Sequence, residues 1–314
     1  MNKQMTSNLI RRFGLLIIIL LMVTVMSFVA PVFRTPGNLI NILRQVSING
    51  ILAVGLTFVI LTGGIDLGVG SLVAVTGVIV GSMLLNGHSV VESIAVSMFV
   101  SILFGIFNGV MIAYFGLPPF IATLATQTIG NGFALVYSNG RPFAISNEVF
   151  KNIGKGSIVG IPIPIIIMVS VCVVALLVLN FTTFGRHIFA LGGNRNAAKL
   201  SGVRTRRVEL LVYVISAFCA AVVGIILASR ISSGQPTAGK GYELDAIASV
   251  AIGGTSMSGG VGQLSGTIMG FIIIGILSNS LTLLNVSSFY QDIVKGFIIL
   301  FAVLMDMRTK KREG

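Results

Sequence analysis

Long apolar runs separated by short polar segments cover almost the whole of this 314-residue chain. Several runs reach the length of about 20 residues that an α-helix needs to cross a bilayer. The pattern predicts an all-α protein, a polytopic transmembrane helical bundle of about ten spans that forms a single domain over residues 1–314. Eight spans would also fit if two glycine-rich segments re-enter the membrane. The predicted spans are residues 13–33, 46–62, 71–85, 93–115, 120–137, 163–181, 210–228, 246–252, 264–283 and 293–304.

The longest clearly polar interruption, residues 182–208, lies between the sixth and seventh predicted spans. It carries six basic residues and no acid: Arg186, Arg195, Lys199, Arg204, Arg206 and Arg207. Its middle predicts a short helix, because Asn194 suits an N-cap and Gly202 suits the position after the last turn. The residues between them that favour a helix are Ala197, Ala198 and Leu200. The segment serves either as a basic anchor at the membrane surface or as a docking helix for a soluble partner.

Composition and charge also place the chain in a membrane. Charged residues make up 10% of it, against about 25% in a soluble domain. The net charge of +12 does not indicate a nucleic-acid partner, because the basic residues lie at the two ends and between apolar runs, where they contact anionic lipid. With the N-terminus inside, thirteen of the 21 Lys and Arg residues fall in inner segments and seven in outer ones. We therefore expect both termini and residues 182–208 to be cytoplasmic.

Two glycine-rich segments resemble each other in the two halves of the chain. Gly63-Gly64 precedes the apolar run that starts near residue 71, and Gly253-Gly254 precedes the run that starts at residue 264. Glycine-broken spans at matching positions of two halves are typical of a substrate path in transporters. The alternative is chance, since the chain has 38 glycines and glycine packs membrane helices closely.

Polar residues inside the predicted spans are candidates for a translocation path. Asp66 follows the first glycine pair, and an acid at a membrane span is costly unless it is paired or hydrated. The alternative role for Asp66 is to cap the next helix. Thr123, Gln127 and Asn131 recur every fourth residue and so share one helix face, which either lines a path for an uncharged solute such as a sugar or bonds neighbouring helices. The chain has no Trp to stack on a sugar ring, which argues against a tight sugar site in the membrane.

A second substantial polar loop precedes the short apolar run at residues 246–252. Its candidate residues for an outer gate or for contact with an outside partner are Gln235, Tyr242, Glu243 and Asp245. The alternative is an ordinary loop closed by a helix cap.

Several catalytic and nucleotide-binding motifs are absent from the sequence. There is no G-x-x-x-x-G-K-[ST], no H-E-x-x-H and no G-x-S-x-G. The two cysteines both fall in apolar runs and predict no disulfide, and the two histidines lie in separate loops. We therefore expect no catalytic residues, no metal site and no ATPase within this chain. An ion-coupled secondary transporter stays open as an alternative, although its coupling acids or histidines would have to lie deep in the spans.

Five stretches together resemble the permease subunit of ribose-type ATP-binding cassette importers. They are residues 60–72, 119–142, 189–203, 232–270 and 285–306. The stretch at 232–270, SSGQPTAGKGYELDAIASVAIGGTSMSGGVGQLSGTIMG, is the most specific and is most similar to ribose permeases. The chain departs from the family pattern at Asn131, where such permeases often carry a basic residue.

The resemblance implies partners and roles that composition does not. It implies a second copy of the chain, a cytoplasmic ATP-binding cassette subunit that hydrolyses ATP, and an extracytoplasmic sugar-binding protein, all at a bacterial inner membrane. The chain itself would be a transport subunit without a cofactor. Residues 194–202 become the coupling helix, and the segments after Gly63 and Gly253 become parts of the pathway. The implied substrate is ribose, with allose, galactose, xylose or a signalling furanose as alternatives.

Overall fold

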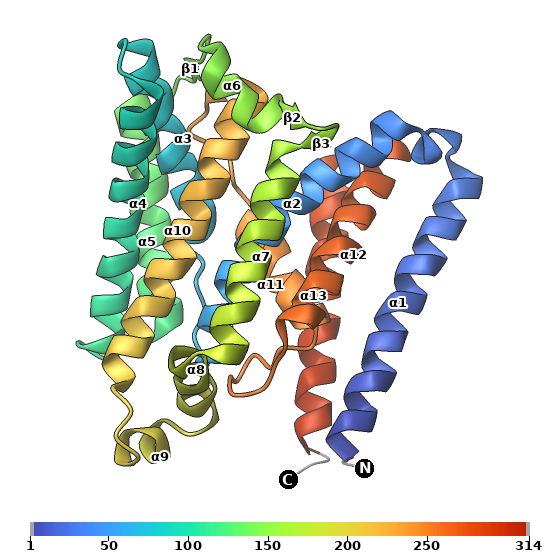
Figure 1. Ribbon diagram of the computed structural model, residues 1–314, viewed down its shortest axis with the longest axis vertical. Helices are drawn as coiled ribbons and strands as arrows, with labels where there is room; N and C mark the ends of the chain where they lie inside the picture. The colour runs from blue at the N-terminus through green and yellow to red at the C-terminus, as the bar shows by residue number, and fades with distance from the viewer. Residues whose placement is uncertain (1–2, 312–314) are drawn as a thin grey trace.

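The computed structural model describes residues 3–311, with side-chain environments for residues 13–301 and 304 (Figure 1). The predicted all-α class is confirmed, because helices make up most of the described chain and the strands are only two residues long. They are α1 (Lys3–Val29), the 3-10 helix η1 (Pro31–Arg34), α2 (Pro36–Leu61), α3 (Val69–Leu85), α4 (Val90–Ala113), α5 (Pro119–Ser138), α6 (Glu148–Lys155), α7 (Ile163–Phe181), α8 (Thr183–Gly193), α9 (Arg195–Leu200), α10 (Thr205–Ile231), α11 (Tyr242–Ile252), α12 (Leu264–Leu283) and α13 (Ser288–Lys311). Four two-residue strands form two antiparallel pairs, β1 (Phe143–Ala144) with β4 (Ser233–Gly234) and β2 (Ser157–Ile158) with β3 (Ile161–Pro162).

Five of the described helices are long and apolar enough to cross a membrane, namely α2, α4, α7, α10 and α12. Two shorter apolar helical stretches accompany them, α3 and the part of α1 at Phe13–Val29. The most apolar windows of α2 and α10 are 83% and 67% buried, whereas those of α4 and α7 are only 22% and 28% buried. α2 and α10 therefore form the centre of the bundle, while α4 and α7 expose apolar faces of the kind that contact lipid.

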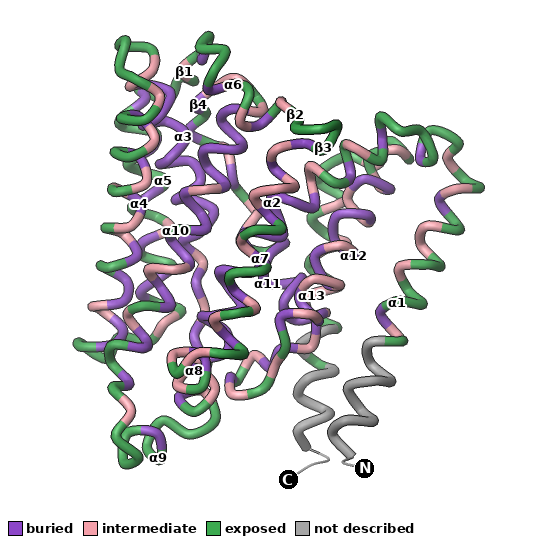
Figure 2. Tube along the Cα trace, in the orientation of Figure 1, coloured by how far each residue is buried: buried purple, intermediate pink, exposed green. Residues whose placement is uncertain are grey.

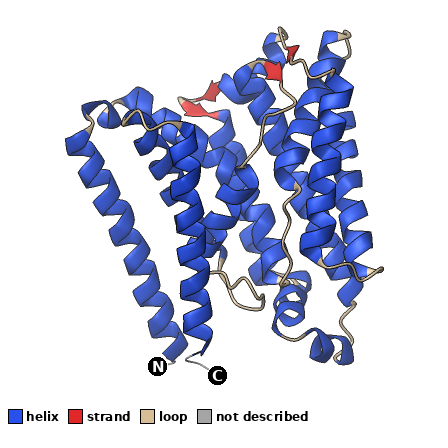
Figure 3. Cartoon of the chain, turned by 180° about the vertical axis from the view of Figure 1, so that it is seen from behind, coloured by secondary structure: helices blue, strands red, loops and turns tan. Residues whose placement is uncertain are grey.

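The two ends of the bundle differ in structure. Both chain termini lie at the same end as α8 and α9, and the strands and α6 lie at the opposite end (Figures 1 and 3). Burial is concentrated in the interior formed by α2, α3, α10 and α11, while α1 stands at the periphery (Figure 2). The common side of the termini and the α8–α9 segment agrees with the pattern of basic residues in the sequence.

The second helix begins earlier than the sequence pattern predicted. The polar stretch after residue 34 was expected to separate the first two spans, but α2 starts at Pro36 and runs without a break to Leu61. Thr35 caps it by accepting a hydrogen bond from the Asn38 backbone N–H, and proline suits the first helical position. The buried Asn38 side chain pairs with Asn279 of α12 at 3.1 and 2.9 Å, so this polar residue stabilises the helix packing instead of ending the helix.

The polar interruption at residues 182–208 contains two helices, one of which was predicted. α9 matches the predicted docking helix: the Asn194 side chain accepts a hydrogen bond from the Ala197 N–H at 2.9 Å, and Gly202 follows the helix with φ of +83°. α8 was not predicted. Thr182 caps α8, and its apolar face buries Ile188 and Leu191.

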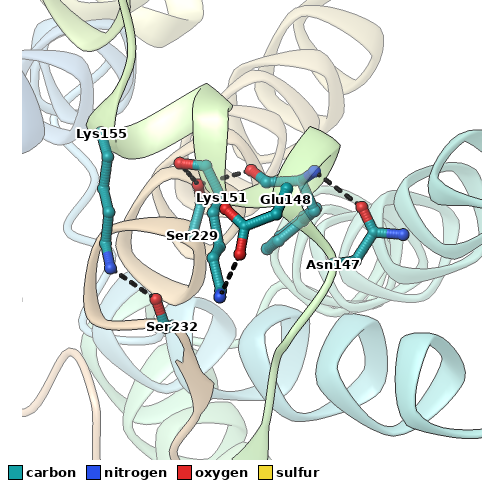
Figure 4. Close-up of polar contacts among 7 residues, drawn as sticks. Asn147, Glu148, Lys151, Lys155, Ser229 and Ser232 are labelled. Carbon is teal, nitrogen blue, oxygen red and sulfur yellow. Dashed lines mark hydrogen bonds and ion pairs between the residues drawn. The ribbon is translucent and has the colours of Figure 1, made fainter.

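At the opposite end, α6 is fixed to the end of α10 (Figure 4). The Ser229 hydroxyl accepts a hydrogen bond from the Gly154 N–H at 2.7 Å and donates to the Phe150 carbonyl at 2.6 Å. Lys155 donates to the Ser232 hydroxyl at 2.6 Å. On the exposed side of α6, Lys151 donates to Glu148, and this bond together with the lysine charge lowers the pKa of the Glu148 carboxyl. The polar residues 138–160, between the fifth and sixth predicted spans, therefore form an ordered cap at this end of the bundle.

Candidate coupling and translocation sites

The helix α9 presents one apolar side chain at the tip of the bundle. Leu200 is 89% exposed, whereas Ala198 is only 5% exposed. Asn194 and Gly202 form the two ends of the helix, and Ala197 is exposed beside Leu200. Of the five predicted coupling residues, Ala197 and Leu200 are thus available to a partner. Ala198 is not, because its methyl group is buried within the chain.

An ion pair holds α9 against the start of α10. Arg195 donates both guanidinium nitrogens to the Glu209 carboxylate, at 2.8 and 2.5 Å. The Glu209 side chain is 8% exposed and that of Arg195 is 52% exposed. A bidentate pair of this kind fixes direction as well as distance. The pair therefore links α9 to the beginning of α10, one turn after its first residue.

At Gly192, α8 closely approaches the backbone at the ends of two interior elements. The Gly260 N–H donates to the Leu61 carbonyl at 2.9 Å, which joins the segment after α11 to the end of α2. A Cβ added at Gly192 of α8 would overlap both of these backbone groups. A Cβ added at Gly259 would lie 2.6 Å from the Gly63 nitrogen. We call the residues Leu61, Gly63, Gly192, Gly259 and Gly260 the glycine junction. The two glycine-rich segments that resemble each other in the sequence meet here.

Two helices begin inside the bundle after non-helical segments. α3 follows the irregular residues 62–68, and α11 follows residues 235–241 (Figure 3). The two starts are in contact, because a Cβ at Gly70 would lie 2.6 Å from the Gly239 carbonyl oxygen and would overlap the Glu243 carboxylate. Non-helical backbone at membrane depth is tolerated where protein buries it or where it lines a cavity. Such interrupted helices commonly mark the substrate region of transporters.

Asp66 is placed for a structural role in this region. It is 1% exposed, and it accepts hydrogen bonds from the Gly68 N–H at 2.9 Å and the Ser216 hydroxyl at 2.8 Å. It thereby orders the turn before α3 and ties that turn to α10. Asp66 does not cap α3 itself, because the N-cap of α3 is Gly68 and no side chain caps that helix.

The predicted polar stripe on α5 runs from the interior to the surface. The buried Thr123 hydroxyl donates to the Pro119 carbonyl at 2.9 Å, Gln127 donates to Glu243 of α11 at 2.8 Å, and Asn131 is exposed. Gln127 is therefore the hydrogen-bond partner of a carboxylate that is only 7% exposed, and its removal would leave part of a buried acid without a partner.

We expect the two outer stripe residues to respond differently to leucine. If the stripe lines a path for an uncharged solute, Asn131→Leu should lower transport of that solute while the chain still assembles, because the change removes a polar group from an exposed face. Gln127→Leu should also lower the yield of folded protein, since a lost hydrogen bond to a charged group costs about 1.5–3 kcal/mol. Uptake per inserted molecule and the melting temperature in detergent separate the two effects.

A double variant controls for the stability that is lost when Gln127 alone is replaced. Gln127→Leu with Glu243→Leu should recover much of the thermal stability, because both partners are then apolar. Normal transport by Asn131→Leu would mean that the stripe serves only helix packing.

The four predicted outer-gate residues separate into different environments. Tyr242 and Asp245 lie on one face of α11 and line a cavity of about 390 Å³, while Glu243 points to α5 and Gln235 is exposed in the preceding loop. Asp245 accepts a hydrogen bond from Lys295 of α13 at 2.9 Å. The sequence did not predict this cavity, because its walls come from five helices. Its lining residues are Gln45, Ile48, Asn49, Leu227, Arg230, Ile231, Tyr242, Asp245, Ser278, Thr282, Gln291 and Lys295.

Two interrupted helices at the centre of an apolar bundle, which approach the short helix α8 at one end through glycine backbone, are typical of membrane transport permeases. Residues 38–303 match the family described as branched-chain amino acid transport system / permease component, and the chain belongs to this family.

Curated relatives match almost the full chain. The ribose import permease protein RbsC of Bacillus subtilis is 45% identical over 96% of this chain and 94% of its own length. RbsC of Haemophilus influenzae is 46% identical over 94% of this chain and 93% of its own length. The L-arabinose ABC transporter permease protein AraH of Azospirillum brasilense is 38% identical over 98% of this chain and 90% of its own length. No solved structure matches the chain.

Proposed function

We propose that the chain is the membrane-spanning subunit of an ATP-binding cassette importer that carries ribose from a binding protein into the cytoplasm. The observation that carries the proposal is similarity of 45 and 46% identity to ribose import permeases over nearly the whole chain. The arabinose permease at 38% identity supports a monosaccharide path in general. Ribose therefore ranks ahead of allose, galactose, xylose or a signalling furanose.

The proposed complex contains two copies of the chain, a cytoplasmic cassette subunit at α9 and a sugar-binding protein at the α6 end. ATP is hydrolysed by the cassette subunit, and no cofactor is assigned to the permease. The exposed Leu200 beside basic Lys199 suits a shallow cleft on the cassette subunit. Apolar faces of the outer helices contact lipid.

In the proposed mechanism, ATP binding favours one of two conformational states of the translocation pathway. Closure of the cassette subunits moves α9 and, through the Arg195–Glu209 pair, the start of α10. α8 moves with α9 and transmits the displacement through the glycine junction to α2 and to the segment after α11. ATP contributes by stabilising one state over the other. Sugar enters from the α6 end in the first state and leaves at the α8 end in the second.

The proposed topology has ten crossings, with the termini and α8–α9 in the cytoplasm. Each interrupted helix completes a crossing together with its non-helical segment, which favours ten crossings over eight. The excess of Lys and Arg at the α8–α9 end supports the orientation. In a background without Cys172 and Cys219, Ser201→Cys should react with an impermeant thiol reagent only from inside and Ser157→Cys only from outside. Reaction of both from outside would refute this orientation.

A secondary transporter is the second candidate, and one observation favours it. The sequence suggested span interiors nearly free of charge, yet Asp66, Glu243 and Asp245 are all buried in the bundle. Each of them has a hydrogen-bond partner, which suits a structural role better than proton or sodium binding. Uptake driven by an ion gradient in the absence of the cassette subunit would select this alternative.

The test of the proposal measures ATP hydrolysis by the reconstituted complex in lipid nanodiscs. Binding protein loaded with D-ribose should stimulate hydrolysis more than the same protein with L-arabinose, D-allose, D-galactose or D-xylose. Stimulation by another of these sugars would reassign the substrate within the same class. Absence of stimulation by all of them would refute the importer proposal.

A further inference from the structure

A polar cavity lies inside one copy of the chain, between α2, α10, α11, α12 and α13. Its volume of about 390 Å³ falls in the range of about 300–1,000 Å³ that is usual for small-molecule sites. It lies toward the α6 end, because Arg44, next to its lining residue Gln45, donates to the Lys155 carbonyl of α6 at 3.1 Å. The cavity is therefore on the side from which the proposed substrate arrives.

Three residues that line this cavity each carry a buried side-chain atom that has no hydrogen-bond partner among the described residues. These atoms are Gln45 Oε1, Asp245 Oδ1 and Ser278 Oγ. The Asp245 side chain is strongly buried, at 4% exposure, and only its second oxygen is occupied, by Lys295. Buried polar atoms normally have partners, so their convergence on one cavity indicates an occupant that supplies the missing bonds.

The chemistry of these atoms limits the occupant. The Gln45 amide oxygen and the Asp245 carboxylate oxygen can only accept, so the occupant must donate hydrogen bonds. A fully deprotonated inorganic anion such as sulfate has no hydrogen to donate, and a cation would be repelled by Arg230 and Lys295. A neutral molecule with several hydroxyl groups meets both conditions, because each hydroxyl donates to the acceptors and also accepts from the cationic side chains.

We propose that this cavity is a monosaccharide-binding site within each copy of the permease. In it, Gln45 and Asp245 accept hydrogen bonds from sugar hydroxyls, Arg230 and Lys295 donate to sugar oxygens, and Tyr242 forms part of the wall. The proposal rests on the proposed sugar-import function and places a sugar site inside the protomer. α11 runs from this cavity, at Tyr242, to the segment that enters the glycine junction. Occupation of the cavity and movement of the cytoplasmic end are thus linked by one short helix.

The test is protection of a cysteine in the cavity wall by sugar. Ser278→Cys, in a background without Cys172 and Cys219, is assembled with the cassette subunit in nanodiscs and treated with a small thiosulfonate reagent. D-ribose should slow its reaction at least severalfold, and glycerol at the same concentration should slow it less. Ser157→Cys, outside the cavity, should react equally with and without sugar.

A second variant tests the role of the acceptor. Gln45→Met keeps the length of the side chain and removes its hydrogen-bonding groups, so the ribose concentration needed for protection should rise at least severalfold. The comparison uses the ribose concentration for half-protection, measured relative to the rate of the same variant without sugar. A structural role alone would change the rate without sugar and leave the ribose concentration for half-protection unaltered.

Two results would overturn the proposal. Failure of Ser278→Cys to react at all would show that the cavity is closed to solutes, and an unchanged rate in saturating ribose would show that it holds only water. Ribose-stimulated ATP hydrolysis by the parent complex is measured in parallel. Stimulation without protection would remove the cavity site and leave the importer function intact, while absence of stimulation would count against the function itself.

Discussion

Gly192→Ala should reduce ATP-driven sugar uptake about tenfold or more, while Gly193→Ala should leave it almost unchanged. A methyl group at Gly192 would overlap the Leu61 carbonyl and the Gly260 nitrogen, whereas nothing lies within 4 Å of a Cβ at Gly193. Overpacking of this kind costs about 1–3 kcal/mol, and 1.4 kcal/mol corresponds to about tenfold in an equilibrium. Uptake per inserted permease in proteoliposomes measures the effect.

Gly193→Ala is the matched control for Gly192→Ala. Both substitutions add one methyl group near the end of α8, so a general effect on helix stability would appear in both variants. Retention of the cassette subunit should persist in Gly192→Ala, because α9 itself is unchanged. Equal uptake by the two variants would show that the glycine junction does not transmit coupling.

Leu200→Glu should separate the permease from its cassette subunit. Leu200 is 89% exposed at the tip of α9, so the substitution alters a contact surface and leaves the packing of the chain intact. Loss of a central apolar anchor costs about 2 kcal/mol or more, which corresponds to roughly thirtyfold in affinity. Arg204→Gln should weaken retention only a few-fold, because peripheral charges act mainly on the association rate. Pull-down of the cassette subunit compares the two.

This contrast separates docking from simple anchoring of the basic segment. An anchor depends on charge, so it predicts that Arg204→Gln is at least as harmful as Leu200→Glu. Ala198→Glu, which the sequence pattern alone would select, is a poorer test because Ala198 is 5% exposed and an acid there would disturb the local fold. Normal cassette retention by Leu200→Glu would contradict the docking role.

Local features of the fold could be predicted from the sequence. The α9 helix follows from Asn194 and Gly202, because a cap and a left-handed glycine act within a few residues of the chain. The early start of α2 carried a comparable signal in Thr35-Pro36, a cap followed by proline, which the polar character of residues 34–44 obscured. The helix α8 was missed because its buried residues, Ile188 and Leu191, lie in a short segment that carries basic residues.

Contacts between distant segments could not be predicted in the same way. The glycine junction joins residues near 61, 192 and 260, and nothing in the spacing of glycines specifies which of the 38 approach each other. Likewise, the pairing of Asp245 with Lys295 depends on how α11 packs against α13. The sequence therefore pointed to Asp245 as an outer-gate residue, while its place in a cavity wall became visible only in three dimensions.

The most direct test of the account is uptake of labelled D-ribose into proteoliposomes that contain the permease, the cassette subunit and the sugar-binding protein. The account predicts uptake that requires ATP on the cassette side, requires the binding protein on the other side, and persists after proton and sodium gradients are collapsed. Uptake by the permease alone, driven by an ion gradient and indifferent to ATP, would contradict it.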